Sequence, residues 1–364
     1  MDTTDPQITF DRAGRCCHCI EFLDKRAKHS YHGKESNDVF ERLLEKITRA
    51  GRGKKYDCVI GVSGGVDSSY LAYIIKERGL RPLAVHMDNG WNSEKAVVNI
   101  KNITRKLGID YESYVLDWEE FKNLQLAFLK ASVPEAETPT DLAIQAALHS
   151  IAAKHGIKYI LSGGNLATEG ILPKSWHYDV RDLKYFNYIH RRFGTRPLKS
   201  FPTFGYQREI YYKVVKGMRM VYPLNHVRFI KEEAMQALRD KFDWRPYGGK
   251  HYESTYTKFI QSYYLFEKFK IDYRRATFSN RICIGEIDRD QAVEQLKCSP
   301  YKPEEIVEAK RYVAKKLGID KEQLEQIMRL PAKWYWDYPN DERKLSFIYR
   351  TYRKLFKTEK LDRF

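Results

Sequence analysis

The stretch 57–79, DCVIGVSGGVDSSYLAYIIKERG, decides the fold. Its apolar run Cys58–Val62 predicts a buried strand, and apolar residues at helical spacing follow from Tyr70 until Gly79. A turn rich in serine and glycine, residues 63–69, joins the two elements. At such a junction unpaired backbone N–H groups and the positive end of the helix dipole meet. The sequence therefore predicts an anion site suited to phosphate.

The turn residues fit a nucleotide phosphate. Two adjacent glycines allow close backbone approach, serine hydroxyls add donors, and Asp67 can hold magnesium against the phosphates. No Gly-Lys-Ser/Thr follows, which excludes a Walker loop, and S-G-G-x-D-S resembles the pyrophosphate loop of the ATP pyrophosphatase superfamily. The resemblance implies attack at the α phosphate of ATP with release of pyrophosphate; the alternative is an ordinary turn that caps a helix. The predicted ATP-binding residues of this turn are Ser63, Gly64, Gly65, Val66, Asp67, Ser68 and Ser69.

Composition limits the classes of protein to consider. The 364 residues can form a large core, and two domains, or one domain with appendages, are expected. No apolar run approaches a membrane span and no leader opens the chain, so we expect a cytoplasmic enzyme. The net charge of +16 predicts anionic partners without naming them.

The positive charge is concentrated in residues 181–219, where basic and aromatic side chains alternate. Such a segment is suited to a nucleotide diphosphate, RNA or an acidic protein, and a solvated basic face is the alternative for any single arginine. Its basic residues are Arg181, Lys184, Arg191, Arg192, Arg196, Lys199, Arg208, Lys213, Lys216 and Arg219.

From residue 57 onward strands and helices alternate, which predicts an α/β fold with a doubly wound parallel sheet. Further strands are expected at 82–87, 111–116 and 157–161, and helices at 93–108 and 118–130. A third helix is expected from Thr138, its N-cap, to residue 155. Ligands of such sheets bind outside the carboxyl ends of the strands.

Two more loops at carboxyl ends of strands are therefore candidates for the ATP site. After the second strand, the backbone of Met87 is suited to the adenine edge and Asp88 to the ribose, although a plain strand end is the alternative. After the fourth strand, the segment 162–170 offers groups for the phosphates and magnesium, or an ordinary glycine turn with a surface acid. The residues expected there are Gly163, Gly164, Asn165 and Glu169.

We expect three regions: an N-terminal extension (1–50), an ATP-binding α/β domain (51–230) and a helical C-terminal domain (231–364). Helical spacing of apolar residues supports the last region, at 229–238, 259–269, 291–296, 303–317 and 321–328. Residues 341–364 predict a basic amphipathic tail helix.

Several further stretches resemble the N-acetyl sugar amidotransferases of bacterial surface-polysaccharide (lipopolysaccharide O-antigen) biosynthesis. The most specific is GGKHYESTYTKFIQ, residues 248–261, which continues to the Asp-Tyr-Arg-Arg run at 272–275. The opening residues 2–19 and the Tyr-Pro-Asn-Asp run at 338–341 match the same family. The resemblance therefore spans most of the chain.

The resemblance implies ATP-dependent formation of an amidine. The acetamido oxygen of a UDP-linked N-acetyl sugar attacks the α phosphate of ATP, and ammonia then displaces AMP to leave an acetamidino group. Lys250 would neutralise the leaving pyrophosphate, while Arg274 and Arg275 would hold substrate phosphates; a surface ion-pair network is the alternative for each. His251 and Glu253 are candidates for substrate orientation or proton transfer.

The ammonia has to come from elsewhere, because the assigned regions leave no room for a glutaminase domain and Asp2 follows Met1. The resemblance implies a separate glutaminase with a cyclase-like barrel subunit, both similar to the histidine-biosynthesis pair.

Relatives also carry a Cys-x-x-Cys pair ahead of the segment matching residues 1–6, and it forms a zinc site with the second pair. Here Cys16 and Cys19 have ligand spacing but do not fill a tetrahedral site. Either the true start lies upstream, or the site is lost or completed otherwise; the possible further ligands are Cys17, His18, Cys283 and Cys298.

Two rival functions remain. A tRNA thiolase would use the same loop and the positive charge, but no recognisable RNA-binding module accompanies the loop, so nucleic acid is not the expected partner. A non-catalytic binding protein that kept the fold is the other rival. The sequence leaves open the sugar, its nucleotide carrier and the oligomeric state.

Overall fold

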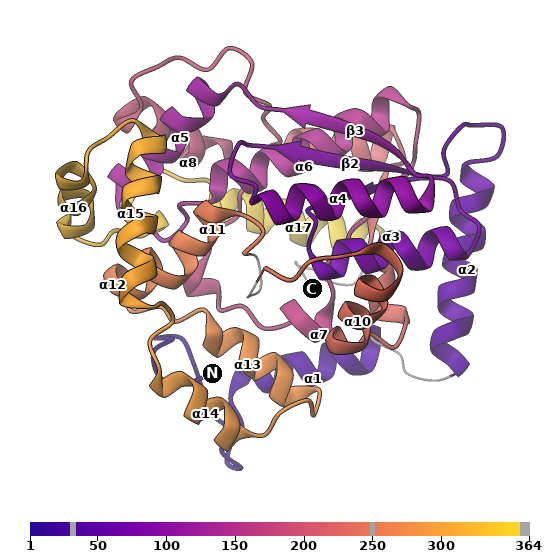
Figure 1. The fold of residues 1–364 in the computed structure, drawn as a ribbon, viewed down its shortest axis with the longest axis horizontal. Coiled ribbons are helices and arrows are strands. Elements are labelled where there is room, and N and C mark those ends of the chain that lie inside the picture. The colour runs from indigo at the N-terminus through magenta and orange to yellow at the C-terminus, as the bar shows by residue number, and fades with distance from the viewer. Residues whose placement is uncertain (30–33, 248–251, 357–364) are drawn as a thin grey trace.

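The computed structural model describes residues 1–29, 34–247 and 252–356 and contains a five-stranded parallel sheet. Figure 1 labels two of its strands, β2 and β3. The strand order is β3-β2-β1-β4-β5. The strands are β1 (Cys58–Gly61), β2 (Pro82–Asp88), β3 (Asp110–Val115), β4 (Tyr159–Leu161) and β5 (Arg219–Val221). The predicted α/β class with a parallel sheet is confirmed, and β5 is a strand that the sequence pattern did not predict.

Helices cover both faces of the sheet, as the side chains of β1 show, because successive residues pack on opposite faces. Cys58 and Ile60 pack against α2 (Lys34–Ala50), α3 (Val66–Glu77), α4 (Glu94–Leu107) and α10 (Lys231–Phe242). Val59 points the other way and packs on α6 (Thr138–Lys154). Because β1 is buried on both sides, it consists of continuous apolar residues rather than alternating ones.

The helix boundaries largely follow the expected ranges. Ser93 caps α4, with its hydroxyl accepting from the N–H of Ala96, and Gly108 ends it in a left-handed conformation. The prediction that Thr138 caps α6 is wrong, because Thr138 is the first residue of the helix. Glu137 takes the N-cap position without a side-chain hydrogen bond. The remaining helices of this half are α1 (Cys17–His29), α5 (Trp118–Ala131), α7 (Leu166–Glu169), α8 (Leu183–Phe193) and α9 (Tyr206–Ile210).

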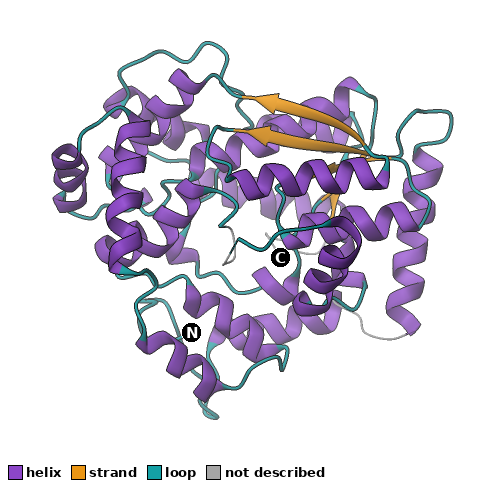
Figure 2. Ribbon diagram, in the orientation of Figure 1, coloured by secondary structure: helices purple, strands orange, loops and turns teal. Residues whose placement is uncertain are grey.

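After residue 230 the described chain is mainly helical, as Figure 2 shows by its colouring. A continuous helical stretch runs through α11 (Thr255–Phe259), one π turn (Ile260–Tyr264) and α12 (Leu265–Phe269). The helices that follow are α13 (Arg274–Cys283), α14 (Arg289–Lys297), α15 (Pro303–Leu317), α16 (Lys321–Arg329) and α17 (Glu342–Phe356). No helix among the described residues combines the length and the apolar character that a bilayer crossing requires.

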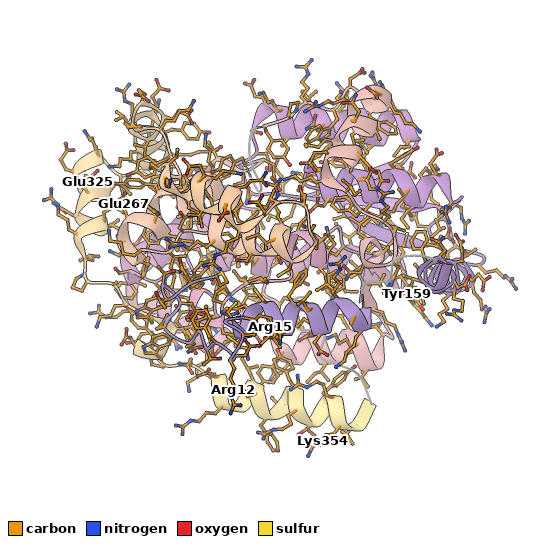
Figure 3. The ribbon with its side chains drawn as sticks, turned by 90° about the horizontal axis from the view of Figure 1, so that it is seen from below. Arg12, Arg15, Tyr159, Glu267, Glu325 and Lys354 are labelled. Atoms are coloured by element: carbon orange, nitrogen blue, oxygen red, sulfur yellow. The ribbon has the colours of Figure 1, made fainter. Side chains whose placement is uncertain are left out.

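The segment just before α17 is hydrogen-bonded to the first half of the chain. The Tyr338 hydroxyl donates to the carbonyl of Ala131 (2.7 Å), and the Asp341 N–H donates to the Asp182 carboxylate (2.6 Å). These bonds fix the start of α17 against α5 and α8. The outer surface carries many of the basic groups, among them the exposed Arg12, Arg15 and Lys354 labelled in Figure 3.

The turn after β1 takes its shape from Gly64, whose φ is +80°. A Cβ atom there would lie 2.4 Å from the carbonyl oxygen of Ala96 in α4, closer than any real Cβ contact. The Gly64 carbonyl accepts hydrogen bonds from the Trp244 indole (3.0 Å) and the Asn99 amide (3.2 Å). Glycine is therefore required both by its backbone conformation and by the approach of α4.

We expect Gly64→Ala to lower the free energy of unfolding far more than Gly53→Ala. Both glycines have positive φ, but a Cβ at Gly53 meets nothing within 4 Å, so the control isolates the clash with Ala96. The conformational cost common to both is about 1–2 kcal/mol, and the clash adds about 1–3 kcal/mol at Gly64. Urea unfolding of the two variants measures the difference; equal losses would show that the approach of α4 is not a constraint.

Candidate active site

The segment 63–69 follows β1, as predicted, and its residues from Val66 onward form the first turn of α3. We call this segment the phosphate loop. The hydroxyl oxygens of Ser63 and Ser68 lie 3.3 Å apart, and the Gly65 N–H donates to the Ser63 hydroxyl (3.3 Å). Gly65 occupies the N-cap position without a side-chain bond to the helix. The helix start consequently keeps its backbone donors for a ligand or a neighbouring side chain.

The loop after β4 packs directly on this helix start. A Cβ atom at Gly163 would lie 2.7 Å from the backbone nitrogen of Ser68, so only glycine fits there. The Thr168 hydroxyl donates to the Asp67 carboxylate (3.1 Å). The structure thus brings the segment 162–170 to the loop 63–69, on either side of the change in strand order between β1 and β4.

Within that segment the buried Asn165 has a structural role. Its carbonyl oxygen accepts from the Thr168 N–H (3.0 Å) and its amide donates to the Gly163 carbonyl (3.2 Å). These bonds cap α7, so both polar ends of the side chain are engaged. Glu169, at the end of α7, lies near enough to Glu253 to raise the pKa of that carboxyl.

Glu253 comes from the C-terminal half and reaches the phosphate loop. The Ser93 N–H donates to its backbone carbonyl (2.8 Å), which fixes the segment beside the start of α4. A Cβ atom at Gly65 would lie 3.4 Å from its Oε1 atom, while its Oε2 atom is buried without a hydrogen-bond partner. Burial raises the pKa of Glu253, and repulsion by Asp67 raises it further.

Tyr247 is a part of the site that sequence reasoning missed. Its hydroxyl lies 3.0 Å from the position of a Cβ on Gly65, and it bonds the backbone of Val66 and the side chain of Glu253. The pKa of Tyr247 is raised, mainly by burial. Its place immediately before the motif at 248–261 was the available signal, but nothing local in the sequence connects it with Gly65.

These groups fit ATP with magnesium. Carboxylate oxygens from Asp67 and Glu253 are the ligands that Mg²⁺ prefers, and a buried, unpartnered oxygen beside a second carboxylate favours a cation between them. In the part of the chain that the structure describes, no three His, Cys, Asp or Glu side chains are arranged to hold a metal. Magnesium at nucleotides does not require such a cage, because phosphate oxygens and water complete its shell.

The candidate adenine loop lies on the same edge of the sheet. Met87 lies within β2 and aligns with Tyr114 of β3, while the register of β2 with β1 ends earlier, at Val85. The Asp88 carboxylate accepts from the Gly90 N–H (2.9 Å) and so shapes the turn. His86 is a packed strand residue that contacts the carbonyl of Val62 (2.8 Å), and burial lowers its pKa.

The structure describes only some of the remaining motif residues. Lys250 and His251 lie outside the described residues. The Arg274 guanidinium forms a paired contact with Asp272 (2.7 and 3.0 Å) and donates to the carbonyl of Cys298 (2.8 Å). Arg275 pairs with Asp2 (2.9 Å). The structure therefore gives both arginines internal carboxylate partners, which is the ion-pair alternative considered above.

Three thiols meet near the N-terminus. The sulfur atoms of Cys16 and Cys19 lie 3.3 Å apart, and Cys283 of α13 lies beside Cys19, where the hydrogen bond between them lowers the pKa of Cys283. His18 instead contacts Asp5 (2.6 Å). Among residues 1–29, 34–247 and 252–356, no set of three or more His, Cys, Asp or Glu side chains is arranged to hold a metal ion. The described thiols therefore do not complete a tetrahedral zinc site.

Some of the basic side chains in residues 181–219 form ion pairs within the chain. Arg181 contacts Asp179 and Glu209 (both 2.8 Å), and Lys213 contacts Glu209 (2.7 Å). The aromatic residues Tyr185 and Phe186 are buried in a core cluster with α5. For these residues, packing and ion pairing account for the composition without a bound polyanion.

Two family models match separate stretches of the chain. A family model described as "Queuosine biosynthesis protein QueC" matches residues 57–148, which include the phosphate loop. A model described as "LPS biosynthesis protein WbpG-like, C-terminal domain" matches residues 253–355, which begin at the glutamate that reaches this loop.

Individual relatives are distant. Uncharacterized protein MJ1599 of Methanocaldococcus jannaschii is 20% identical over 84% of this chain and 92% of its own length. The tRNA-specific 2-thiouridylase MnmA 2 of Fusobacterium nucleatum is 29% identical over 36% of this chain and 41% of its own. A tRNA(Ile)-lysidine synthase of Chlamydia pneumoniae is 38% identical over 18% of this chain and 21% of its own. The last two matches thus span less than half of those enzymes.

Among solved structures, U34-tRNA thiolase NcsA from Methanococcus maripaludis with its [4Fe-4S] cluster matches with a TM-score of 0.33 and 13% identity. That match covers 74% of this chain and 85% of the thiolase. NH3-dependent NAD synthetase from Campylobacter jejuni matches with a TM-score of 0.29 and 17% identity, over 39% of this chain and 62% of the synthetase. Likenesses this weak carry no argument about the site.

The loop, the parallel sheet and the two family matches support the PP-loop ATP pyrophosphatase superfamily as the class of this protein. Its C-terminal region is similar to the WbpG-like domain of lipopolysaccharide biosynthesis.

The raised pKa of Glu253 predicts a pH-dependent stability of the protein without nucleotide. The folded protein binds this proton more tightly than the unfolded chain does, so stability falls as the pH rises above about 4.5, the ordinary value. We expect Glu253→Gln to raise the melting temperature at pH 8 and to have little effect at pH 4. Glu45→Gln, at an exposed position on α2, is the control; a loss of stability at pH 8 would contradict the prediction.

The internal partners of Arg274 predict a structural effect of its removal. We expect Arg274→Ala to lower the free energy of unfolding by about 3 kcal/mol, because it leaves the buried Asp272 carboxylate without its cation. Arg311→Ala, at an exposed position on α15, should cost less than about 0.5 kcal/mol. If Arg274→Ala leaves urea unfolding unchanged and instead weakens binding of a nucleotide sugar, the phosphate-holding role implied by the family resemblance is correct.

Proposed function

We propose that this protein is an ATP-dependent amidotransferase that converts the acetamido group of a nucleotide-linked N-acetyl sugar into an acetamidino group for surface polysaccharide. One observation carries the proposal: Glu253, the first residue of the WbpG-like region, lies against Gly65 and Asp67 of the phosphate loop. This contact supports one site to which the WbpG-like region and the phosphate loop would both contribute.

The chemistry follows from the weakness of an amide as an electrophile. The amide oxygen attacks the α phosphate of ATP, the bond to the β phosphate breaks, and pyrophosphate leaves. Ammonia then adds to the activated carbon, AMP departs with the oxygen, and the amidine remains. The acetamido oxygen thus leaves on AMP, and nitrogen takes its place.

The loop residues would perform the first step by holding the outer phosphates. Backbone N–H groups at the start of α3 and the Ser63 and Ser68 hydroxyls are the donors. A phosphate oxygen would compete with the Tyr247 hydroxyl for the Val66 N–H, so binding requires this tyrosine to give way. Magnesium, held by Asp67 and Glu253, would neutralise phosphate charge.

Residues outside this core have supporting roles in the proposal. Met87 and Asp88 would contact the nucleoside, and Lys250 would stabilise the leaving pyrophosphate. The ammonia would come from a separate glutaminase with its barrel subunit, which the family resemblance implies.

The test is a reaction of the protein with Mg-ATP, ammonium chloride and a panel of UDP-linked acetamido sugars, analysed by mass spectrometry. We expect AMP, pyrophosphate and a sugar in which O is replaced by NH. Asp67→Asn should lower the rate at least ~10²-fold while the protein stays folded, because the metal ligand is lost. Asp240→Asn, at an exposed position on α10, is the matched control. Full activity of Asp67→Asn would contradict the assigned role of Asp67.

A tRNA thiolase is the second candidate, favoured by the matched thiouridylase and by the thiols of Cys16, Cys19 and Cys283. The same assay distinguishes it. Pyrophosphate release that needs tRNA and a sulfur donor, with no change in any sugar, would support the thiolase and reject the amidotransferase.

A further inference from the structure

A cavity beside the loop after β4 has no role in the site described so far. It is lined by residues of α1, α7, a 3-10 turn (Pro223–His226), the start of α10 and the chain just after α13. Helix α13 packs on both α1 and α7 (Figure 1). The volume is about 320 Å³, within the range of about 300–1,000 Å³ in which proteins hold small organic ligands. We call it the basic cavity, after its lining residues Arg26, Arg228 and Lys231.

Part of the lining of the basic cavity is apolar. Phe22 and Leu166 form a buried cluster on which Ile284 packs, and Val227 adds a half-buried side chain. Such a surface gives a ring system, for example a nucleobase, an area to pack on. A free inorganic ion would leave this part of the lining unused.

Two of the three cations lie at the start of a helix. Arg228 and Lys231 stand on either side of Ile230, the N-cap of α10, which makes no side-chain cap hydrogen bond. The two side chains and the unpaired N–H groups of the first turn therefore lie within one short stretch of chain. Cations combined with backbone donors favour the oxygen atoms of a phosphate or diphosphate.

The contacts that these cations already make are weak or incomplete. Arg228 pairs with Glu233 at 3.3 Å, but both side chains are exposed, so the pair contributes little. The Arg26 guanidinium donates to the Cys283 carbonyl (3.0 Å) through Nη1. In the described part of the chain, no carboxylate pairs with Lys231. Glu286 is the one acidic residue among the described lining residues, and its charge is balanced by Arg281 (2.9 Å).

Asn225 adds a buried donor to the lining. The residue is 5% exposed, and its Oδ1 atom accepts from the Leu166 N–H (2.8 Å), which assigns the other end of the amide as a donor. No described residue accepts from this NH₂ group. It is therefore available to an acceptor oxygen of a molecule in the cavity.

The basic cavity adjoins the phosphate loop. Thr168 lines the cavity, and its hydroxyl donates to the Asp67 carboxylate (3.1 Å). Asn225 holds the first N–H of the same helix, α7, through Leu166. A molecule bound in the cavity would thus be separated from the proposed magnesium ligand by a single side chain.

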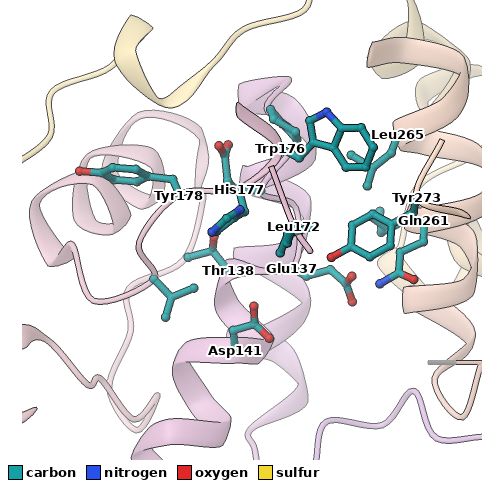
Figure 4. A pocket seen from close by; sticks show the side chains of 14 residues that line it. Glu137, Thr138, Asp141, Leu172, Trp176, His177, Tyr178, Gln261, Leu265 and Tyr273 are labelled. Carbon is teal, nitrogen blue, oxygen red and sulfur yellow. The ribbon is translucent and has the colours of Figure 1, made fainter. Parts of the chain in front are cut away.

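A second cavity has the opposite charge. Glu135, Glu137 and Asp141 line this acidic cavity, whose volume is about 70 Å³. Figure 4 shows the Glu137 and Asp141 carboxyl groups together with the Trp176 and Tyr273 rings. None of its described lining residues is Lys or Arg, so it offers no countercharge to a phosphate. Of the two cavities, the basic one suits an anionic substrate.

We propose that the basic cavity binds the nucleoside diphosphate part of the nucleotide-sugar substrate. The inference rests on the proposed function, which requires such a substrate beside the phosphate loop. The diphosphate would contact Arg228, Lys231 and the N–H groups at the start of α10, with Arg26 as a third cation. The base would pack on the apolar lining, and the Asn225 amide would donate to one of the acceptor oxygens. The acetamido sugar would then extend past Thr168 toward Asp67.

The first test measures binding of UDP to the full chain by isothermal titration calorimetry. Magnesium and a non-hydrolysable ATP analogue are present, so that the phosphate loop is occupied. We expect Arg228→Gln and Lys231→Gln each to weaken UDP binding at least ~10-fold, because a charge-assisted contact is lost. Arg239→Gln, at an exposed position in the last turn of α10, is the matched control and should change the affinity less than ~2-fold.

Pyrophosphate is the second probe and should bind at least ~10-fold more weakly than UDP, because it cannot use the apolar lining. Absence of UDP binding, UDP binding that both variants retain, or equal affinity for UDP and pyrophosphate would each overturn the site. Binding of a tRNA in place of UDP, lost in the same two variants, would also overturn it.

The second test separates this inference from the proposed function. In the amidine-forming reaction, Arg228→Gln should raise the KM for the UDP-linked sugar at least ~10-fold and change the KM for ATP less than ~2-fold. If amidine forms and the KM for the sugar is unchanged, the function stands and the site is wrong. If no sugar is converted but UDP binds and both variants lose this binding, the site stands and the function is wrong.

Discussion

The candidate site depends on the close approach of α4 to the turn after β1, which only glycine at position 64 permits. The Ala96 carbonyl occupies the space where a side chain would project, and Asn99 of the same helix bonds the Gly64 carbonyl. Trp244 donates to that carbonyl from the other direction. Because the carbonyl is held in this way, the turn has one shape, and the N–H groups at the start of α3 are presented at a fixed place.

The distribution of charge is the second constraint. The protein is strongly basic, yet Asp67, Glu169 and Glu253 gather at the phosphate loop, and Glu135, Glu137 and Asp141 line the acidic cavity. Both groups contain buried carboxyls whose pKa is raised. Burial disfavours the charged form of such groups, and at the phosphate loop a bound cation would offset that cost.

Several basic side chains, in contrast, form ion pairs within the described part of the chain. Arg181, Arg274 and Arg275 all contact carboxylates of their own chain. Composition alone could not separate this outcome from the binding of a polyanion, because a guanidinium suits an internal carboxylate and an external phosphate equally well. The choice depends on whether a carboxylate lies within reach in the folded chain.

The sequence by itself determined the elements whose signals are local. The apolar run of β1, the glycines after it and the alternation of strands and helices predicted the parallel sheet and the phosphate loop, since strand burial, glycine turns and helix starts depend on near neighbours. The cap of α6 was misplaced by one residue, because the chain before Thr138 turns at Glu137. Only the tertiary structure decided that Tyr247 and Glu253 meet Gly65, and that Trp176 and Glu135 line one cavity. Those residues are far apart along the chain, and their contact depends on how the helices pack on the sheet, which no local pattern specifies.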